Sequence, residues 1–298
     1  MKILLINIDS TIPNLALAKI AKYHQDKGDE VFWDIPLIKC DKIYVSCVFT
    51  KNRHEAEQWM GKAEIGGSGF DLTTNLPSEI EAVKPHINLG FTTRGCIRKC
   101  PFCIVPQKEG GIRSVGDLLD LWDGNTKDVV IMDNNILALP EHFETICKQA
   151  IANKIRVDFN QGLDHRLLTP EIVGLLKRIS HKDYKFAFDH PSYLPTVDNA
   201  ITLLQANGIR RSTWYVLSGY NTTFEQDLDR CNYLKSRGQN AFVQRYETVC
   251  DNVRYSMLAR WANQHNMFQT HTFVEFVNHP KHRNQKKEME IAVSQRQG

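Results

Sequence analysis

Three cysteines stand close together in this chain, and their type and spacing predict chemistry. Cys96, Cys100 and Cys103 follow the pattern C-x3-C-x2-C within the stretch Thr93–Cys103. One loop with this spacing can wrap a single small inorganic centre with three thiolates. A 4Fe-4S cluster has four irons, so three protein cysteines leave one iron open to a small chelating molecule, while hydrogen bonds and burial set the reduction potential.

Two other interpretations of the three thiols stay open. Structural zinc takes four ligands, usually as two separated pairs, and the nearest histidines, His86 and His142, do not give the ordinary finger spacing. Alternatively, the three thiols are inert structural groups. The other cysteines stand alone without a second C-x2-C pair, so each is expected to be a small buried hydrophobe: Cys40, Cys47, Cys147, Cys231 and Cys250.

The cysteine spacing, with the aromatic Phe102 just before the last cysteine, resembles the signature of the radical S-adenosylmethionine (SAM) enzymes. The resemblance implies that the amino and carboxylate groups of SAM chelate the open iron. It implies that one electron from the cluster cleaves the sulfonium to a 5′-deoxyadenosyl radical, which abstracts hydrogen from an unreactive carbon. An electron donor such as a flavodoxin or ferredoxin is implied as a partner.

The composition is ordinary for a globular protein. At 298 residues the chain can form one large α/β domain or two unequal ones. The formal charge of +3, from 37 basic and 34 acidic residues, is too small by itself to indicate a nucleic-acid partner. The sequence has no apolar run of membrane-spanning length, and it starts without the zones of a signal peptide. Thiols and an oxidisable cluster then predict a reducing cytoplasm.

Residues 1–85 are predicted to form a small Rossmann-like α/β domain. Apolar and β-branched runs predict strands, and one helical pattern opens at Pro13 and ends at Gly28. The predicted strands are residues 2–7, 30–33 and 42–48, and a short helix or linker starts at Leu76.

This region resembles a shortened form of the N-terminal domain in the cobalamin-binding and methylthiotransferase branches of the radical SAM superfamily. Gly66–Phe70 resembles the glycine turn that those domains carry late in the fold, and a plain tight turn is the alternative. Asp9–Asn14 lacks the histidine and glycine of the cobalamin branch, so cobalamin is not expected. Without further paired cysteines, a second cluster is not expected either.

Residues 86–278 are predicted to form a partial (β/α)6 barrel of the radical SAM type. From the second strand on, strand–helix units recur at roughly 28 residues, which is typical of right-handed βαβ crossovers. Helix starts carry capping or proline signals at Ser114, Pro140, Thr169, Pro195 and Thr223. The predicted strands are residues 87–92, 128–132, 155–160, 185–188, 212–217 and 241–244. A helix and a last strand are expected within residues 260–276, and a basic flexible tail in residues 279–298.

Parallel barrels place their functional groups at the carboxyl ends of the strands and in the loops that follow. By the resemblance, SAM is expected to contact residues near the cysteines and in these loops: Phe102, Asp133, Asn134, Asn135, Gln161, Asp164, Asp189 and Gly219. Alternatives stay open for most of them. Residues 133–135 also fit an Asx turn, Asp164 an ion pair with Arg166, Asp189 a helix cap, and Gly219 a turn.

Four further residues are candidates for substrate contact: Lys108, Tyr220, Arg245 and Glu247. A solvated loop is the alternative for Lys108, an interfacial tyrosine for Tyr220, and a mutual ion pair for Arg245 and Glu247. The basic segment 279–287 is typical of contact with RNA or phosphate, or simply of a solvated end.

These observations predict a cytoplasmic radical SAM enzyme that abstracts hydrogen from a small molecule or nucleotide. Radical modification of tRNA or a peptide is the second hypothesis, and a non-catalytic zinc-binding module is the third. The fold class does not name the substrate.

Overall fold

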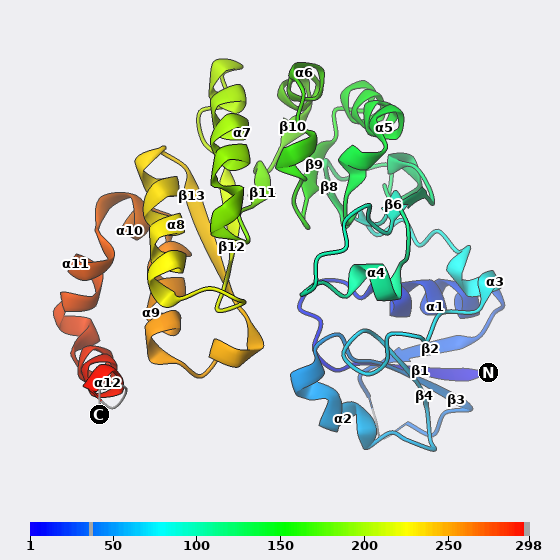
Figure 1. Cartoon of the computed structure of the whole chain (residues 1–298). Helices are drawn as coiled ribbons and strands as arrows, with labels where there is room; N and C mark the ends of the chain where they lie inside the picture. The colour runs from blue at the N-terminus through cyan, green and yellow to red at the C-terminus, as the bar shows by residue number, and fades with distance from the viewer. Residues whose placement is uncertain (36–37, 295–298) are drawn as a thin grey trace. The chain divides into compact units, whose positions relative to one another are not determined.

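The computed structural model describes residues 1–35 and 38–294. The chain divides into two compact units, Met1–Asn134 and Asn135–Gly298, and each is described by itself (Figure 1). The predicted α/β class with parallel strands is confirmed. The predicted domain boundaries at residues 85 and 278, and the partial (β/α)6 barrel, stay predictions.

The first unit begins with a parallel sheet in the order β2-β1-β3-β4. Strand β1 (Lys2–Asn7) lies between β2 (Glu30–Trp33) and β3 (Lys42–Ser46), and β4 (Glu64–Gly66) pairs with β3. A continuous apolar run suits a central parallel strand, because both of its faces are covered. The three predicted strands are confirmed, whereas the short β4 was missed.

The two faces of β1 pack against different helices. Ile3 and Leu5 form a core with α1 (Leu15–Asp26) and α3 (Ser78–Glu81), while Leu4 and Ile6 form another with α2 (Arg53–Glu57). Figure 1 places α1 and α2 on opposite sides of the sheet. Full burial of one such side chain contributes roughly 1.5–3 kcal/mol, so these alternating residues fix the register of β1.

The glycine turn after β4 packs directly against the backbone that follows β3. Gly67 has φ +100°, and a Cβ there would lie 2.2 Å from the carbonyl oxygen of Cys47. A Cβ on Gly69 would lie 2.5 Å from the carbonyl carbon of Phe49. Ser68 Oγ donates to the carbonyl of Val48 at 3.1 Å. The turn therefore needs glycine for close backbone contact as well as for its turn geometry.

Replacing Gly67 by alanine should destabilise the protein more than replacing Gly61. Both glycines have positive φ, but a Cβ on Gly61 meets no atom within 4 Å. Gly61→Ala should cost roughly 1–2 kcal/mol from the backbone conformation alone. Gly67→Ala should cost about 1–3 kcal/mol more because the backbone must move. Urea unfolding of both variants measures the difference, and equal losses would contradict the close contact.

The rest of the first unit carries two short strand pairs. Strand β5 (Leu89–Gly90) pairs in parallel with β8 (Asp128–Ile131), and β6 (Thr93–Arg94) pairs antiparallel with β7 (Arg113–Ser114). The short helix α4 (Val105–Lys108) lies between β6 and β7.

The helix predicted to start at Ser114 is wrong. Ser114 belongs to β7, and Asp117 caps only the 3-10 turn Leu118–Asp120. The carboxylate of Asp120 accepts from the Asp117 amide and contacts Lys84, which completes a short closed turn. Gly124, with φ +82°, then directs the chain toward β8.

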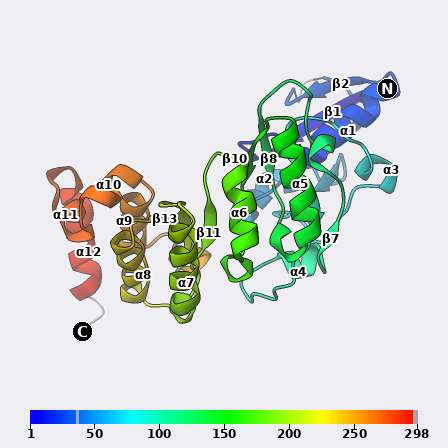
Figure 2. The same cartoon turned by 90° about the horizontal axis from the view of Figure 1, so that it is seen from above.

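The second unit alternates helices with short parallel strands. Strand β9 (Arg156–Phe159) pairs with β10 (Ser180–His181), and β12 (Thr213–Ser218) lies between β11 (Lys185–Ala187) and β13 (Asn240–Arg245). Figure 2 shows the helices in a row beside these strands. They are α5 (Pro140–Ala152), α6 (Pro170–Arg178), α7 (Leu194–Ala206) and α8 (Phe224–Ser236). Short 3-10 turns of this unit are Ile136–Ala138, His165–Leu167, Pro191–Tyr193 and Glu247–Val249, and the turn Thr50–Asn52 belongs to the first unit.

The capping signals of the second unit are confirmed. Thr169 accepts from the amide of Ile172 at the start of α6, and Thr223 forms a capping box with Gln226 at the start of α8. Prolines occupy the first turns of α5, α6 and α7, where their missing amide costs nothing. These local rules therefore placed four of the predicted helix starts.

The C-terminal region is helical, so the predicted last strand within residues 265–276 is wrong. It contains α9 (Val253–Ala262), α10 (His265–Thr270), α11 (Phe273–Asn278), a 3-10 turn (Pro280–His282) and α12 (Arg283–Ser294). Thr272 and Glu275 form a capping box that starts α11. The rings of Phe268 and Phe273 pack against Trp261.

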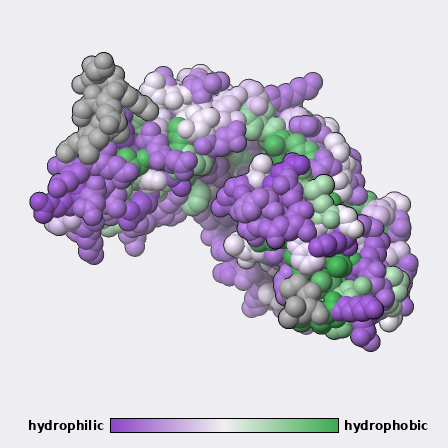
Figure 3. Space-filling model, turned by 90° about the horizontal axis from the view of Figure 1, so that it is seen from below, coloured by the Kyte–Doolittle hydropathy of each residue, from purple (hydrophilic) through white to green (hydrophobic). Residues whose placement is uncertain are grey.

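A helix occupies part of the segment predicted to be a flexible tail, because α12 extends to Ser294. Residues 295–298 of that predicted tail lie outside the described residues. Among the helices described, none is both long and apolar enough to cross a membrane. The face of the molecule in Figure 3 is mainly hydrophilic, with smaller apolar areas.

Candidate functional site

The cysteine loop is closed at its base by backbone contacts. Strands β6 and β7 pair Thr93 with Ser114 on either side of the loop. The amide of Cys96 donates to the carbonyl of Gly110 at 3.3 Å. Gly95 has φ +83°, and a Cβ there would lie 2.2 Å from the carbonyl oxygen of Gly111. The loop thus leaves and re-enters the fold at one closely packed point.

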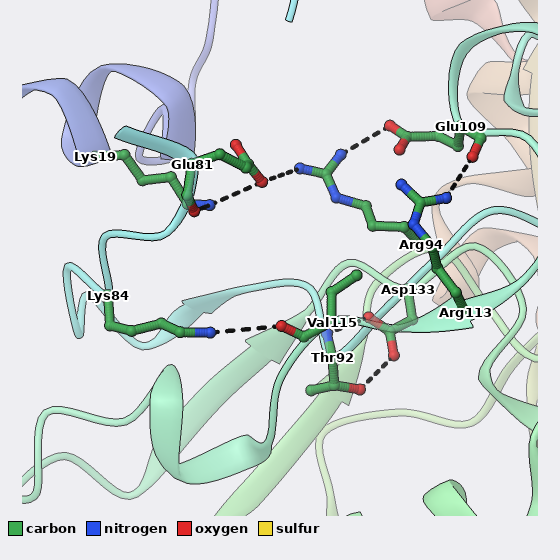
Figure 4. A network of polar contacts seen from close by, with 9 residues as sticks. All are labelled: Lys19, Glu81, Lys84, Thr92, Arg94, Glu109, Arg113, Val115 and Asp133. Carbon is green, nitrogen blue, oxygen red and sulfur yellow. Dashed lines mark hydrogen bonds and ion pairs between the residues drawn. The ribbon is translucent and has the colours of Figure 1, made fainter. Parts of the chain in front are cut away.

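A chain of charged contacts reinforces this closure (Figure 4). Arg94 Nη1 contacts Glu109 Oε1 at 2.7 Å, and the two side chains are 20% and 12% exposed. Arg94 Nη2 also lies 3.4 Å from Glu81, which contacts Lys19 on α1 at 2.9 Å. Arg113 Nη1 donates to the carbonyl of Glu109 at 2.6 Å. Burial, opposed by Glu81, lowers the pKa of Lys19. The base of the loop is therefore tied to the helices on one face of the N-terminal sheet.

Removing the charge of Glu109 should loosen the cysteine loop. Hydrogen bonds to charged groups contribute about 1.5–3 kcal/mol, so Glu109→Gln should raise amide hydrogen exchange in residues 95–110 about tenfold or more. Asp26→Asn is the control, because it removes an exposed i,i+4 partner of Lys22, and it should leave the loop unchanged. Equal exchange in wild type and Glu109→Gln would show that the ion pair does not hold the loop.

The three cysteines of the loop are half-buried thiols. The amide of Arg98 donates to Cys96 Sγ at 3.3 Å, and the amide of Cys103 donates to the carbonyl of Cys100 at 3.0 Å. Phe102 is also half-buried. The loop backbone therefore turns tightly around the cysteines and directs one amide at a sulfur.

The isolated cysteines differ from those of the loop. Cys47, Cys147 and Cys231 are buried, as predicted, and burial raises the pKa of each thiol, to about 12 for Cys147 and Cys231. The prediction of burial is wrong for Cys250, which is exposed, and only partly right for Cys40, which is half-buried.

The loop carries the type of ligand that an iron–sulfur cluster requires. Such clusters take cysteine thiolates, and hydrogen bonds to sulfur tune their potential, which matches three half-buried thiols and the Arg98 amide. The described residues contain no group of three or more His, Cys, Asp or Glu side chains already at metal-binding geometry. The chain thus supplies the donors and a closed loop, but not a convergent arrangement of the three sulfurs.

Asp133 and Asn134, which follow β8, hold the start of the cysteine loop. Asp133 is 4% exposed and accepts from the amide and hydroxyl of Thr92 at 2.7 and 2.5 Å (Figure 4). Asn134 Oδ1 accepts from the amide of Gly95 at 3.3 Å. Burial raises the pKa of Asp133, and the hydrogen bonds from Thr92 oppose that effect. Contact of either residue with SAM stays a prediction.

In the second unit, Asn135 and Asp164 lie in contact. Asn135 Nδ2 donates to Asp164 Oδ2 at 3.2 Å, and Arg166 Nε contacts Asp164 Oδ1 at 2.7 Å. The predicted alternative of an Asp164–Arg166 ion pair is confirmed. Gln161 is exposed in the same loop. Contact of these groups with SAM stays a prediction.

A buried ion pair on α8, missed by the sequence analysis, organises the ends of two strands. Asp227 and Arg230 are 0% and 3% exposed, and their side chains lie 2.5 Å apart. Arg230 Nη2 donates to the carbonyl of Leu217 at 2.7 Å, and Arg230 Nη1 donates to the carbonyl of Phe188. Asp227 Oδ2 accepts from the amide of Gly219 at 2.8 Å. The i,i+3 spacing of opposite charges was the available signal, but spacing does not indicate burial.

Gly219 and Asp189 lie beside this buried pair. Gly219 has φ +84°, and a Cβ there would lie 2.5 Å from Val249 Cγ2, so both the turn and the close packing require glycine. Burial raises the pKa of the half-buried Asp189 to about 6, while Arg230 and Arg166 oppose the shift. The strand ends thus present a carboxyl group that titrates near neutral pH.

Asp189→Asn should stabilise the protein at pH 7.5 and leave its stability nearly unchanged at pH 4. The raised pKa means that the folded state favours the neutral acid, so this stability contribution is lost as pH rises through about 6. Asparagine removes the cost of ionisation. Denaturant unfolding at both pH values measures the effect.

Asp123→Asn provides a control of opposite sign. Hydrogen bonds from the Thr126 amide first, and then from Asn88 and Asn125, hold the pKa of Asp123 low. This substitution should therefore destabilise the protein at pH 7.5. A loss of stability for Asp189→Asn at that pH would contradict the raised pKa.

The predicted substrate residues have different environments. Lys108 is half-buried at the end of α4 in the first unit. In the second unit, the Tyr220 ring packs edge-on against Tyr246 at 4.9 Å. Arg245 Nη1 donates to the carbonyl of Cys250 at 2.5 Å and to Ser256 Oγ at 2.6 Å. The alternative of an Arg245–Glu247 ion pair is wrong, because these two described residues form none.

The sequence is similar to one curated enzyme over part of its length. No protein-family model matches it. The relative is the tRNA-2-methylthio-N(6)-dimethylallyladenosine synthase of Sulfurihydrogenibium sp. (strain YO3AOP1), with 26% identity over 146 residues. The match covers 44% of this chain and 32% of the relative, about a third of its length. It loosely supports the kinship with the radical SAM superfamily predicted from the cysteine spacing.

Proposed function

We propose that this protein is a radical SAM enzyme that holds a 4Fe-4S cluster on Cys96, Cys100 and Cys103. The observation that carries the proposal is the C-x3-C-x2-C pattern on a loop whose base is closed by backbone and charged contacts. When bound, the cluster supplies the electron for cleaving SAM to a 5′-deoxyadenosyl radical. The chain itself supplies position, hydrogen bonds and shielding.

Residues around the loop have separate roles in this proposal. The Arg94–Glu109 ion pair and the Cys96–Gly110 hydrogen bond fix where the loop begins and ends. The Arg98 amide donates to Cys96 Sγ, and such hydrogen bonds tune cluster potential. Half-burial of the thiols limits their contact with water.

The second unit supplies groups suited to the polar parts of SAM. Asp189 titrates near neutral pH, so its carboxyl can accept or donate a hydrogen bond. Asp164 is held by Asn135 and Arg166, which leaves its orientation fixed. Gly219 packs against Val249 at the place of a Cβ, so what it can offer a planar ring is its backbone. We assign these residues to SAM on their chemistry.

The similarity to an enzyme named for a tRNA adenosine favours a nucleotide in RNA among the substrate hypotheses. A free small molecule or nucleotide, and a peptide, remain the alternatives. The electron donor, a flavodoxin or ferredoxin, belongs to the same proposal. Since the match covers about a third of the relative, substrate and reaction are assigned here as a proposal for this chain.

Anaerobic reconstitution tests the function directly. The protein is loaded with iron and sulfide, and 5′-deoxyadenosine is measured after addition of SAM and dithionite. Cys100→Ala should lose the cluster absorbance and reduce 5′-deoxyadenosine to background, because one of the three thiolate ligands is removed. Cys250→Ala is the matched control, since this cysteine is exposed and outside the loop, and it should retain both signals.

Metal analysis after anaerobic purification can contradict the proposed function. Zinc bound without iron or sulfide would contradict the enzyme and favour a zinc-binding module. A full cluster that yields no 5′-deoxyadenosine, with or without added RNA, would contradict the radical chemistry while leaving the metal site intact.

A further inference from the structure

Cationic side chains from three elements of the second unit gather near its C-terminus. Arg260 lies in the last turn of α9, Lys281 lies in the 3-10 turn Pro280–His282, and Arg283 and Lys287 lie on α12. All four side chains are exposed. Helix α12 packs against α9, α11 and the 3-10 turn (Figures 1 and 2). We call these four residues the C-terminal cationic surface.

The half-buried ring of His282 lies near the positive charges of this surface. The His282 ring packs against Phe276 with centroids 4.5 Å apart, and the His279 ring lies 6.1 Å from it. Burial first, and then the positive charges of Arg260, His279 and Lys281, lower the pKa of His282. Arg260 on α9 and Lys281 in the 3-10 turn therefore both act on His282, so these charges lie near each other although they are far apart in the sequence.

The C-terminal cationic surface is not neutralised within the described part of the chain. Arg260, Lys281, Arg283 and Lys287 form no ion pair among the described residues. Arg283 and Lys287 are spaced i,i+4, so they lie on one face of α12 and repel each other by about 0.2–0.5 kcal/mol. A bound anion would relieve this repulsion.

The exposed residues of α12 distinguish between anionic partners. Within residues 283–289 of α12, the part whose side chains the structure describes, the exposed positions are 283, 284, 286, 287 and 288, and all are polar or charged. A helix that binds in a membrane interface needs an exposed apolar face beside its cations, which these positions do not provide. A line of phosphates needs only exposed cations, because backbone contacts carry most of the affinity for nucleic acid.

We propose that the C-terminal cationic surface binds the phosphate backbone of an RNA. The choice of RNA rests on the proposed function, in which RNA carries the reacting nucleotide. The surface positions the RNA without reading its sequence, since phosphate contacts fix position and base contacts fix specificity. It lies outside the groups assigned to the cluster and SAM, so binding and cofactor chemistry can be measured separately.

The experiment compares two triple variants in binding a fluorescein-labelled RNA of twenty nucleotides. Lys281→Ala/Arg283→Ala/Lys287→Ala removes three of the four cations of the surface, and Lys62→Ala/Lys177→Ala/Arg210→Ala removes the same number and kind of exposed cations elsewhere. Fluorescence anisotropy is followed from about 50 to 200 mM salt. The first variant should bind at least tenfold more weakly, and its slope of log Kd against log salt should fall by about 2, from three contacts at about 0.7 each. The control should match wild type.

Three results would overturn the proposal. They are an absence of RNA binding by wild type at the lowest salt, equal binding by the two triple variants, and tighter binding to phosphatidylglycerol vesicles than to RNA. Cluster absorbance and 5′-deoxyadenosine formation without RNA are measured on the same proteins. If those are normal while RNA binding fails, the surface proposal falls and the radical chemistry stands. If RNA binds but no 5′-deoxyadenosine forms, the radical chemistry falls and the surface proposal stands.

Discussion

The buried Asp227–Arg230 ion pair is the interaction on which the strand ends of the second unit depend. Parallel strands finish with carbonyl and amide groups that no further strand satisfies, and buried groups of this kind need partners. Arg230 donates hydrogen bonds to the carbonyls of Phe188 and Leu217, and Asp227 accepts one from the amide of Gly219. Breaking such a pair from one side typically costs about 3–5 kcal/mol, because the other charge is left buried. Helix α8 thereby fixes the backbone at the ends of the two strands, where Asp189 and Gly219 lie.

The first unit meets the same requirement with two networks, one around Asp133 and Asn134 and one of oppositely charged side chains. In the segments that follow β5 and β8, the Asp133 carboxyl accepts from the amide and hydroxyl of Thr92. The side-chain oxygen of Asn134 accepts from the amide of Gly95. At the base of the cysteine loop, Arg94 joins Glu109 and Glu81. Side chains expected to meet a ligand are thus already engaged with the chain. Polar residues after parallel strands form hydrogen bonds with the backbone, and any functional role comes in addition to this structural one.

The sequence predicted those features that local chemistry determines. Apolar runs correctly predicted three strands of the N-terminal region. The capping residues Thr169 and Thr223 correctly predicted the starts of α6 and α8. The short β4 and β10 were missed because two or three residues carry too little pattern. The last strand was wrong because this segment is helical, with Phe268 and Phe273 packed against Trp261. The Asp227–Arg230 pair could not be placed from spacing, since burial depends on the packing of α8 against β12.

The glycine contact at the base of the cysteine loop has a consequence for how such a sequence can change over time. A Cβ on Gly95 would clash with the carbonyl of Gly111, whereas a Cβ on Gly111 would meet no atom within 4 Å. Substitution is therefore restricted at Gly95, whatever the loop carries. Between Gly95 and Gly111, the amides of Cys103 and Lys108 donate to carbonyls of the loop itself. The loop is therefore a module whose interior can acquire new ligands or new partners while the close packing at Gly95 keeps its start in place.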